Sequence, residues 1–489
     1  MKEFKSEQEH RQLVANRYGR QELIRGWNQV RIGNSCVAVV GSGPLANFIA
    51  VSLVGLGVGN VEIYSNARPD GSNDGEFLLG LAGKTHSKVG ALENILSKIN
   101  PLVNVRGIHA GITSLSLAQI LGVPSAIIDV TNDPQSQEVA LEYGRLNEVA
   151  VVIAVADSVR GECYVRLPHK RYSRIIGLER YKNQHQGAIP SEVLGGAVTE
   201  EIRKIIMPFN SREKPVSMLS YSVACLQRFN SEDSLAIDKY FLRDKRVLVV
   251  GAGALGNFAG IGLALAGVGN IDILDFDKVE TTNLNRQVLF YDSVGDKKSK
   301  ALAKMLKQIN PELRIRGLVG KLDEHFACQF RLRENRPDII FDCVDNFRTR
   351  AIINHFAVRY GIPLISGGTS PSSGQVVTYS PGESACLNCK LGVDASLGKE
   401  VASHSCIHVA RPSVIMTNEI VGGMMVAEAR AVLSPQNYGP HIRKMLKYDS
   451  ASHVRGGLVG GDAPCDCKRG AVKEWLSEVI QNGERSTKS

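Results

Sequence analysis

The chain has 489 residues, of which 43% are hydrophobic and 22% are charged, a composition that fits a soluble globular protein with more than one domain. It contains no run of 18 or more apolar residues free of charge or glycine, and its first residues are charged, so we expect neither a membrane span nor a secretory signal. These features predict a cytoplasmic protein without a membrane partner.

The charged residues and the cysteines narrow the class further. The net charge of +9 comes from dispersed Lys and Arg residues with only short clusters such as Lys297-Lys298, so we expect a solvated surface and no nucleic-acid partner. Such a surface also suits an anionic nucleotide or an acidic protein.

Ten cysteines in a cytoplasmic chain indicate reduced thiols, metal ligands or a nucleophile, not a disulfide framework.

In chain order, the sequence contains one passage twice, at an offset of 210 residues between Gly41 and Gly251. The first copy has apolar runs at residues 36–40, 60–64 and 126–128, and the second has them at 246–250, 270–275 and 338–341. In each copy the first run ends in a glycine turn and a helical stretch, which is the pattern of a βαβ unit. We therefore predict an α/β fold with two Rossmann-like, doubly wound domains in tandem that form a pseudo-dimer.

The repeat also sets the predicted domain boundaries. The first domain covers residues 1–215, a polar linker covers 216–240, and the second domain covers 241–445. A tail at 446–489 carries a second cysteine pair. The offset between the copies grows from 213 to 227 residues, so the second copy has 14 extra residues in the interval that contains the predicted crossover loop at 390–412.

Only the second copy keeps its charged residues. By the register, the first copy has Ser65 for Asp275, Ala67 for Asp277, Glu76 for Arg286, Asn132 for Asp345 and Ala46 for Gly256. Asn73 and Lys88 still match Asn283 and Lys298, so the first copy has decayed only in part. An eroded copy beside an intact one predicts a single working active site.

Glycine turns alone favour NAD and a dehydrogenase, but the later motifs of the second copy change this interpretation. They are Asp275-Phe276-Asp277, Asn283-Leu284-Asn285-Arg286-Gln287, Val294-Gly295-Asp296-Lys297-Lys298 and Asp342-Cys343-Val344-Asp345-Asn346. Across most of residues 244–435, the chain resembles the adenylation domain of the E1-like activating enzymes, the family of ThiF and MoeB. The resemblance implies an inactive first adenylation domain and an active second one.

The resemblance also implies ATP and Mg²⁺ as cofactors. Asp275 would contact the ribose, Asp345 would hold the magnesium, and Asn283, Arg286 and Lys298 would contact the phosphates. The other nucleotide-site residues implied are Gly251, Gly253, Gly256, Asp277 and Gln287. This set has a physical reason, because a carboxylate that attacks an α-phosphate is repelled unless cations neutralise the charge.

E1-like enzymes also take an arginine from across a dimer interface. The family signature Arg17-Tyr18-Gly19-Arg20-Gln21 precedes the first copy, and nothing similar precedes the second. Arg20 matches the reaching arginine, so the resemblance implies that the eroded half donates Arg20 to the ATP site of the intact half. The alternative is a surface arginine.

Two cysteine pairs suggest a structural metal. Cys386 and Cys389 are separated by two residues, and Cys465 and Cys467 by one. Four thiolates suit a tetrahedral zinc site, and members of the family close the adenylation domain in this way with the longer spacing in both pairs. The shorter second spacing departs from that pattern, and unliganded thiols are the alternative.

Cys406 stands apart from these pairs, in a segment that leads through Arg411-Pro412 into a predicted helix at 414–433. This arrangement resembles the Atg7-type E1 enzymes of autophagy, where a cysteine at this position forms the thioester. Arg411, His404, His408 and the helix N-terminus would favour the thiolate. The alternative is a buried packing cysteine.

The sequence therefore predicts an E1-type enzyme that adenylates the C-terminus of a ubiquitin-like protein, forms a thioester on Cys406 and passes the acyl group to an E2-like protein. One chain with both domains resembles the E1 of bacterial ubiquitin-like operons of the antiviral Bil type, and a homodimer is possible. The alternatives are a sulfur-carrier adenylyltransferase without a thioester step, and a noncatalytic scaffold.

Overall fold

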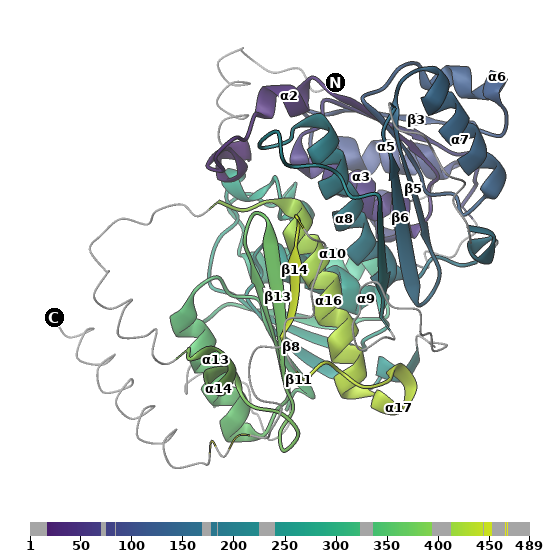
Figure 1. The fold of residues 1–489 in the computed structure, drawn as a ribbon. Coiled ribbons are helices and arrows are strands. Elements are labelled where there is room, and N and C mark those ends of the chain that lie inside the picture. The colour runs from purple at the N-terminus through teal and green to yellow at the C-terminus, as the bar shows by residue number, and fades with distance from the viewer. Residues whose placement is uncertain are drawn as a thin grey trace.

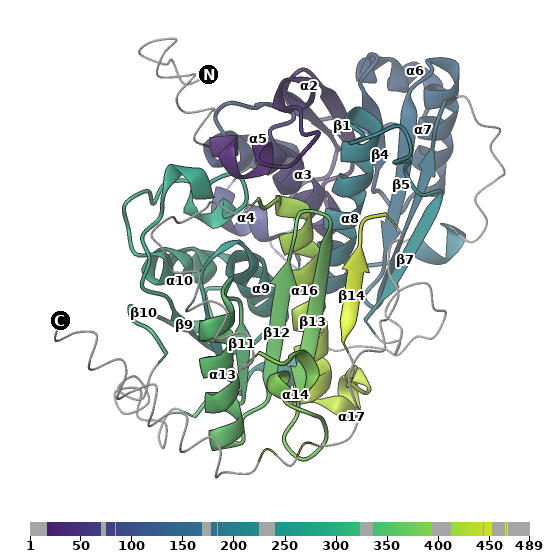
Figure 2. The same cartoon turned by 60° about the vertical axis from the view of Figure 1, so that its left-hand side comes forward.

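The computed structural model describes residues 17–69, 75–83, 85–168, 178–182, 184–223, 240–322, 336–393, 412–443 and 445–451, together with Cys465 and Cys467. The chain folds into two α/β halves, each built around one sheet (Figures 1 and 2). Within the described ranges, no helix has both the length and the apolar character that crossing a bilayer requires.

The first half repeats the order of strand and helix that the sequence predicts. Its elements are α2 (Gln29–Gly33), β1 (Cys36–Val40), α3 (Pro44–Leu56), β2 (Asn60–Tyr64), α4 (Phe77–Ala82), α5 (Lys88–Ile99), β3 (Asn104–Ile108), α6 (Leu115–Ala118), η1 (Gln119–Leu121), β4 (Ala126–Asp129), α7 (Pro134–Leu146), β5 (Ala150–Ala156), β6 (Arg160–Arg166), η2 (Leu178–Tyr181), α8 (Ala188–Ile206) and β7 (Met218–Ser222).

The second half has the same succession of strands, and its short helices differ from those of the first half. Its elements are η3 (Tyr240–Leu242), β8 (Arg246–Val250), α9 (Ala254–Leu265), β9 (Asn270–Leu274), η4 (Thr281–Asn283), η5 (Val288–Phe290), α10 (Lys298–Ile309), β10 (Arg314–Leu318), β11 (Ile339–Asp342), α13 (Phe347–Tyr360), β12 (Leu364–Thr369), β13 (Ser373–Tyr379), α14 (Leu387–Leu391), α16 (Ile415–Leu433), α17 (Pro435–Tyr438) and β14 (Leu446–Asp449).

The two seven-stranded sheets have matching strand orders, β3-β2-β1-β4-β5-β6-β7 and β10-β9-β8-β11-β12-β13-β14. In the order given, the first five strands of each sheet pair in parallel. Each of the last two strands pairs antiparallel with the strand before it. The fold class predicted from the sequence is thus confirmed. In such sheets the strand order reverses beside the first strand, and ligands bind there at the carboxyl ends.

Two edge strands extend the sheets beyond the predicted domain boundaries. Strand β7 belongs to the first sheet although it lies in the stretch expected to be a linker, and β14 belongs to the second sheet although it lies in the expected tail. Both strands have only four or five residues, so their sequences carry little periodic signal.

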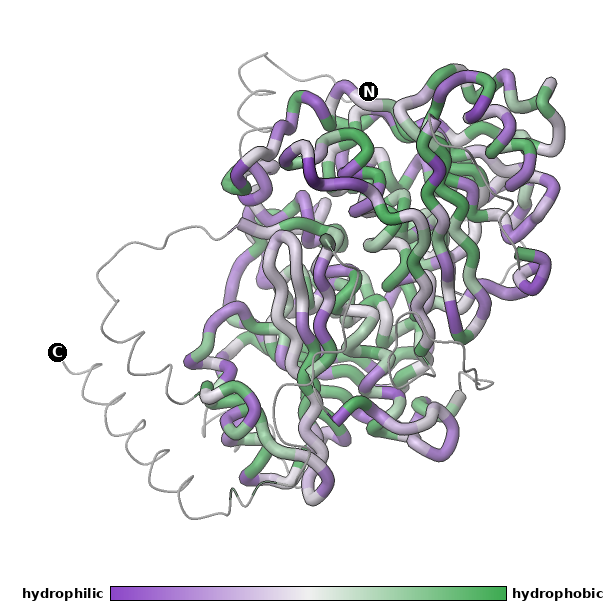
Figure 3. Tube along the Cα trace, viewed as in Figure 1, coloured by the Kyte–Doolittle hydropathy of each residue, from purple (hydrophilic) through white to green (hydrophobic). Residues whose placement is uncertain are grey.

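One hydrophobic core runs through both halves, because four helices meet between the sheets. Helix α8 packs against α3 and α16, and α16 packs against α9. The largest buried cluster contains Phe48 and Val193 of the first half together with Phe258 and Met424 of the second. Figure 3 shows hydrophobic segments in the interior of both halves. The two halves therefore form a single packed unit.

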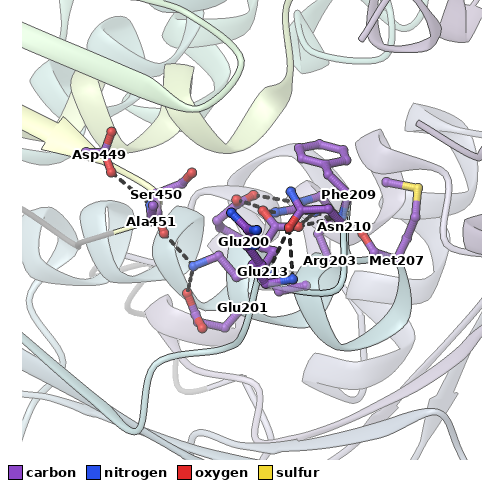
Figure 4. Close-up of polar contacts among 12 residues, drawn as sticks. Glu200, Glu201, Arg203, Met207, Phe209, Asn210, Glu213, Asp449, Ser450 and Ala451 are labelled. Carbon is purple, nitrogen blue, oxygen red and sulfur yellow. Dashed lines mark hydrogen bonds and ion pairs between the residues drawn. The ribbon is translucent and has the colours of Figure 1, made fainter. Parts of the chain in front are cut away.

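A second, polar contact ties the edge strand β14 to the first half (Figure 4). Lys204 is buried on α8, where its Nζ donates to Glu201 Oε1 at 2.7 Å and to the carbonyl of Ser450, just after β14. One residue earlier, Arg203 pairs with Glu200 and Glu213 and lies over the ring of Phe209. Because each buried charge has its partners, this contact fixes how the halves meet.

Two buried carboxyls lie in the interface between the halves. Glu192 on α8 and Glu419 on α16 are fully buried, and they hold equivalent positions in the two copies. Both oxygens of Glu192 and Oε1 of Glu419 lack a hydrogen-bond partner among the described residues, while Ser52 donates to Glu419 Oε2. Burial raises the pKa of both carboxyls well above the usual value, and the charge of Glu419 raises that of Glu192 further.

We expect Glu192→Gln to stabilise the protein at neutral and alkaline pH. A carboxyl whose pKa is raised on folding stabilises the folded state below its unfolded pKa, and that contribution is lost as the pH rises through the folded pKa. The amide never ionises, so the variant gains about 1.4 kcal/mol for each unit of upward shift. Urea unfolding from pH 5 to 9 measures this, with the exposed Glu142→Gln as control. Equal pH slopes for Glu192→Gln and wild type would contradict the prediction.

Candidate nucleotide site

The glycine turn of the second half lies where the order of its sheet reverses. It connects β8 to the N-terminus of α9, with Gly253 as N-cap. Gly251 has a φ of +98°, and a Cβ on Gly256 would lie 2.1 Å from the carbonyl oxygen of Gly251. Only glycine fits both positions. No described atom lies within 4 Å of where a Cβ of Gly253 would be, so the helix terminus has room for an anion.

Asp275 follows β9 and holds the turn from the side. Its carboxylate accepts hydrogen bonds from the backbone nitrogens of Ala252 and Asp277, each at 2.7 Å. Partial burial raises the pKa of Asp275, and these two donors act against that rise. The carboxylate therefore lies beside the glycine turn, as the ribose contact expected for Asp275 requires.

Two buried cations lie near this turn. Lys298 begins α10 and its Nζ lies 3.3 Å from Asp277 Oδ2. Arg286 is 7% exposed, and its pKa is lowered to about 10, chiefly by burial and then by the charge of Arg20. Asp345 acts in the opposite direction on the same guanidinium. Arg20 of the first half and Asp345 of the second therefore both lie within electrostatic range of Arg286.

Arg20 reaches this position because its segment is fastened to both halves. Buried Arg17 donates to the carbonyls of Ile99 in the first half and Leu284 in the second. The backbone nitrogen of Ser413 donates to the carbonyl of Arg20 at 3.2 Å. The signature before the first copy thus lies against the second half, as the sequence predicts for a donated arginine.

The other two predicted nucleotide residues are buried close to Arg286 in the chain. Asn283 accepts a hydrogen bond from the Glu280 nitrogen at 3.0 Å and belongs to a capping box at η4. Gln287 is 4% exposed, and its Oε1 has no partner among the described residues. A buried acceptor without a donor is costly unless something else satisfies it.

In the first half, the equivalent helix terminus is filled by a side chain. Gln186 Oε1 accepts from the Leu45 nitrogen at 3.1 Å, and its Nε2 donates to the Val130 carbonyl at 2.7 Å. The same oxygen lies 2.9 Å from where a Cβ of Gly43 would be. Gln186 thus takes the place that a phosphate oxygen takes at an open helix N-terminus. The equivalent residue in the second half, Ser413, bonds to Arg20 instead.

The substituted residues of the first half also satisfy one another. Ser65 accepts from Ser42 Oγ and from the Ala67 nitrogen, which repeats the geometry of Asp275 without its charge. Asn132 exchanges hydrogen bonds with the backbone of Ala156.

The retained lysine of the first half is neutralised in the same way. Lys88 donates to both oxygens of buried Glu76, at 2.8 and 2.9 Å. Glu76 stands where the second half has Arg286. Asn73, which matches Asn283, lies outside the described residues. The lysine that the first half retains is therefore paired with a carboxylate at the position where the second half has an arginine.

The four cysteines predicted as metal ligands come together at one place. The sulfurs of Cys386, Cys389, Cys465 and Cys467 all lie within 4.8 Å of one another. Cys467 Sγ is 3.5 Å from Cys386 Sγ and 3.2 Å from Cys389 Sγ. A tetrahedral zinc with bonds of about 2.3 Å needs four sulfurs at such separations. The donor set fits zinc despite the short spacing of the second pair.

Cys406 and its neighbours His404, His408 and Arg411 lie outside the described residues, as does most of the predicted crossover loop. The structure describes the chain again from Pro412, and α16 begins at Ile415 with Val414 as its N-cap. The end of the loop is therefore anchored at Ser413, directly beside Arg20.

Sequence reasoning missed several residues around these sites. Gln186 gave no motif, and its partners on either side are more than 50 residues away in the chain. Asn285 lies inside a recognised motif but received no role. Phe276 is 49% exposed directly after Asp275, with Lys321 Nζ 4.7 Å from its ring centroid. Its place in the motif Asp275-Phe276-Asp277 was the available signal.

The chain is similar to known adenylyltransferases over nearly half its length. It is 34% identical over 230 residues to the sulfur carrier protein ThiS adenylyltransferase of Bacillus subtilis, covering 46% of this chain and 66% of that protein. It is 33% identical to the molybdopterin-synthase adenylyltransferase of Escherichia coli, covering 43% and 80%. It is 31% identical to the ubiquitin-like modifier-activating enzyme 5 of Dictyostelium discoideum, covering 44% and 56%.

The chain spans just under two thirds of the Bacillus relative and little more than half of the Dictyostelium one. A family model covers far more of this chain. It is that of the ThiF family, which matches twice, at residues 11–199 and 219–455, once for each half. The matched residues are most of the sequence, and they include both sheets apart from Met218, the first residue of β7. The chain belongs to the ThiF family.

Proposed function

We propose that the protein is an ATP-dependent adenylyltransferase that activates the C-terminal carboxylate of a ubiquitin-like or sulfur-carrier protein. One observation carries this proposal: the glycine turn of the second half is open and is bonded to Asp275, which lies within electrostatic range of Lys298, and Arg286 lies within range of Arg20 and Asp345, while the equivalent turn of the first half is closed by Gln186. The Bacillus relative is named for a sulfur carrier protein, and the Dictyostelium relative is named for a ubiquitin-like modifier.

In the proposed reaction, a carboxylate oxygen of the carrier attacks the α-phosphorus of ATP. The bond from this phosphorus to the bridging oxygen breaks, and pyrophosphate leaves with the electron pair. Asp275 would orient the ribose, and Asn283, Arg286 and Lys298 would bind phosphate oxygens. Arg20 would stabilise the charge on the reacting phosphate, which is a role of donated arginines in phosphoryl transfer.

Mg²⁺ would be held by Asp345, an exposed carboxylate just beyond β11 at the carboxyl edge of the sheet. Carboxylate oxygens are ligands that magnesium prefers, and the ion would neutralise phosphate charge.

We propose structural zinc for the cysteine cluster. It would link Cys386 at the start of α14 to Cys465 and Cys467, 79 or more residues later, and so would hold the end of the chain on the second half.

For the step after adenylation, we propose that Cys406 attacks the acyl adenylate, releases AMP and holds the carrier as a thioester for an E2-like protein. Its local sequence supports this role, and so does the hydrogen bond that ties Ser413, seven residues later, to the carbonyl of Arg20. The competing proposal is a sulfur-carrier enzyme that releases the adenylate without a thioester, and the Bacillus relative is named as an adenylyltransferase of a sulfur carrier protein.

We expect Cys406→Ala to form the acyl adenylate but no thioester, because adenylation uses only Arg20 and the cations and carboxylates of the second half. The assay mixes enzyme and ATP with a panel of ubiquitin-like and sulfur-carrier proteins that end in diglycine. Pyrophosphate release reports the first step, and a reductant-sensitive adduct on a nonreducing gel reports the second.

Cys386→Ala is the contrasting variant, because it should lose metal and stability before it loses chemistry. Pyrophosphate release from no panel member would contradict the proposed function. Release without an adduct in wild type would favour the sulfur-carrier enzyme. A reductant-sensitive adduct that persists in Cys406→Ala would place the nucleophile elsewhere.

A further inference from the structure

A buried chain of hydrogen bonds leads from the first half to the proposed nucleotide site of the second. The carbonyl of Leu56, at the end of α3, accepts from Gln21 Nε2 at 2.9 Å. Gln21 Oε1 accepts from Asn285 Nδ2 at 3.0 Å, and Asn285 Oδ1 accepts from Arg286 Nη1 at 2.8 Å. Gln21 and Asn285 are fully buried. These hydrogen bonds therefore connect one half to the other without contact with solvent.

The groups at the two ends of this series of hydrogen bonds determine which atom donates and which accepts along it. A carbonyl such as that of Leu56 can only accept, and the guanidinium of Arg286 can only donate. Asn285 must therefore turn its oxygen to Arg286 and its nitrogen to Gln21, and Gln21 must turn its nitrogen to Leu56. Neither amide can flip without placing two donors or two acceptors together. The arrangement thus holds the guanidinium in one orientation.

We propose that Asn285 is a positioning residue through which the first half orients Arg286 toward the phosphates of ATP. This inference rests on the proposed function, because it requires the second half to bind ATP. A second bond of the same Nη1, to the Thr282 carbonyl at 2.8 Å, supports the guanidinium from its own half. Asn285 adds the connection to the other half, in the segment that also carries Arg20.

At the corresponding positions, the first half has neither the amide of Asn285 nor the guanidinium of Arg286. By the register, Asn285 corresponds to Gly75 and Arg286 to Glu76, which is paired with Lys88. An amide at position 285 is thus present only beside the open glycine turn. Loss of both the relay and the guanidinium in one copy fits a role of Asn285 that serves Arg286.

The test compares binding of MgATP with binding of adenosine to the full chain by calorimetry. A hydrogen bond to a buried charged group contributes enough that Asn285→Ala should weaken MgATP binding roughly tenfold. Adenosine lacks phosphates, so its affinity should not change. Gln21→Ala should shift MgATP binding in the same direction, and it keeps the Asn285 contact to Arg286 if Asn285→Ala fails to fold.

The swapped pair Gln21→Asn with Asn285→Gln keeps both amides and should restore most of the MgATP affinity. Asn104→Ala, which removes an exposed amide pair with Asn60 on the first sheet, is the control and should change neither affinity. Asn285→Ala added to Arg286→Ala should have no further effect, because the two residues act together.

Three results would overturn the inference, and they can be told apart. Equal weakening of MgATP and adenosine by Asn285→Ala would make the residue merely structural. Unchanged MgATP affinity in Asn285→Ala, with weakened affinity in Arg286→Ala, would reject the relay and leave the proposed function standing. Unchanged MgATP affinity in Arg286→Ala would reject the nucleotide site itself.

Discussion

Asp345→Ala should lower adenylation by about a thousandfold or more, because loss of a magnesium ligand removes several kcal/mol of charge stabilisation and each 1.4 kcal/mol is about a factor of ten. Asp345 is exposed at the carboxyl edge of the second sheet, so its removal leaves no cavity in the core. The fold should therefore remain intact. Pyrophosphate exchange with a diglycine-ending carrier measures the loss, and circular dichroism checks the fold.

The matched control is Asn132→Ala in the first half. Asn132 stands at the equivalent position, but its side chain is bonded to the backbone of Ala156, and Gln186 fills the nearby helix terminus. We expect full adenylation activity and only some loss of stability, because a buried hydrogen-bonded pair is broken. Similar losses of activity in both variants would show that the two halves share the chemistry, against a single site.

The fold class was predictable from the sequence because the same pattern of apolar runs and a glycine turn occurs twice in the chain. Each glycine turn lies between buried β-branched runs, such as Val37 to Val40, and the same spacing returns 210 residues later. Register alone was enough to pair Asp275 with Ser65 and Arg286 with Glu76, and the structure places these pairs at equivalent turns. What the register could not predict is how the uncharged half satisfies its own polar groups.

The missing parts of the site depend on contacts between distant segments. The sequence placed Gln186 in no motif, yet it closes the first turn because α8 begins beside the N-terminus of α3. Asn285 is adjacent to Arg286, but its role becomes visible only when Gln21 arrives from 264 residues earlier. The short spacing of Cys465 and Cys467 argued against a complete metal site, and only three-dimensional proximity to Cys386 removes that objection.

The tandem arrangement also explains why one copy could lose its charges. An enzyme of two identical chains needs every residue in each chain, since each subunit both binds the nucleotide and donates an arginine. In a fused chain, the first half can keep Arg20 and its docking residues Arg17 and Gln21 while its own turn is closed. The second half can keep the nucleotide site alone. The common core of both halves preserves the geometry between them.

Arg20→Ala should lower the rate of adenylation by roughly 10³-fold or more, the range found for donated arginines in phosphoryl transfer, and should weaken MgATP binding far less. The reason is that negative charge on the reacting phosphate grows toward the transition state, so a cation placed there acts mainly on turnover. The pKa of Arg286 is lowered in part by Arg20, so removal of Arg20 also relieves a repulsion between two cations.

The effect of Arg20→Ala on turnover can be separated from its effect on stability. Thermal unfolding of the variant distinguishes a loss of stability from a slower reaction. Arg25→Ala, in the turn just after the Arg20 segment, is the control and should keep normal turnover. The kcat and KM for ATP, measured by pyrophosphate release with a saturating carrier, separate the two effects. Normal kcat in Arg20→Ala would show that the eroded half contributes no catalytic group, and a large rise in KM alone would make Arg20 a binding residue.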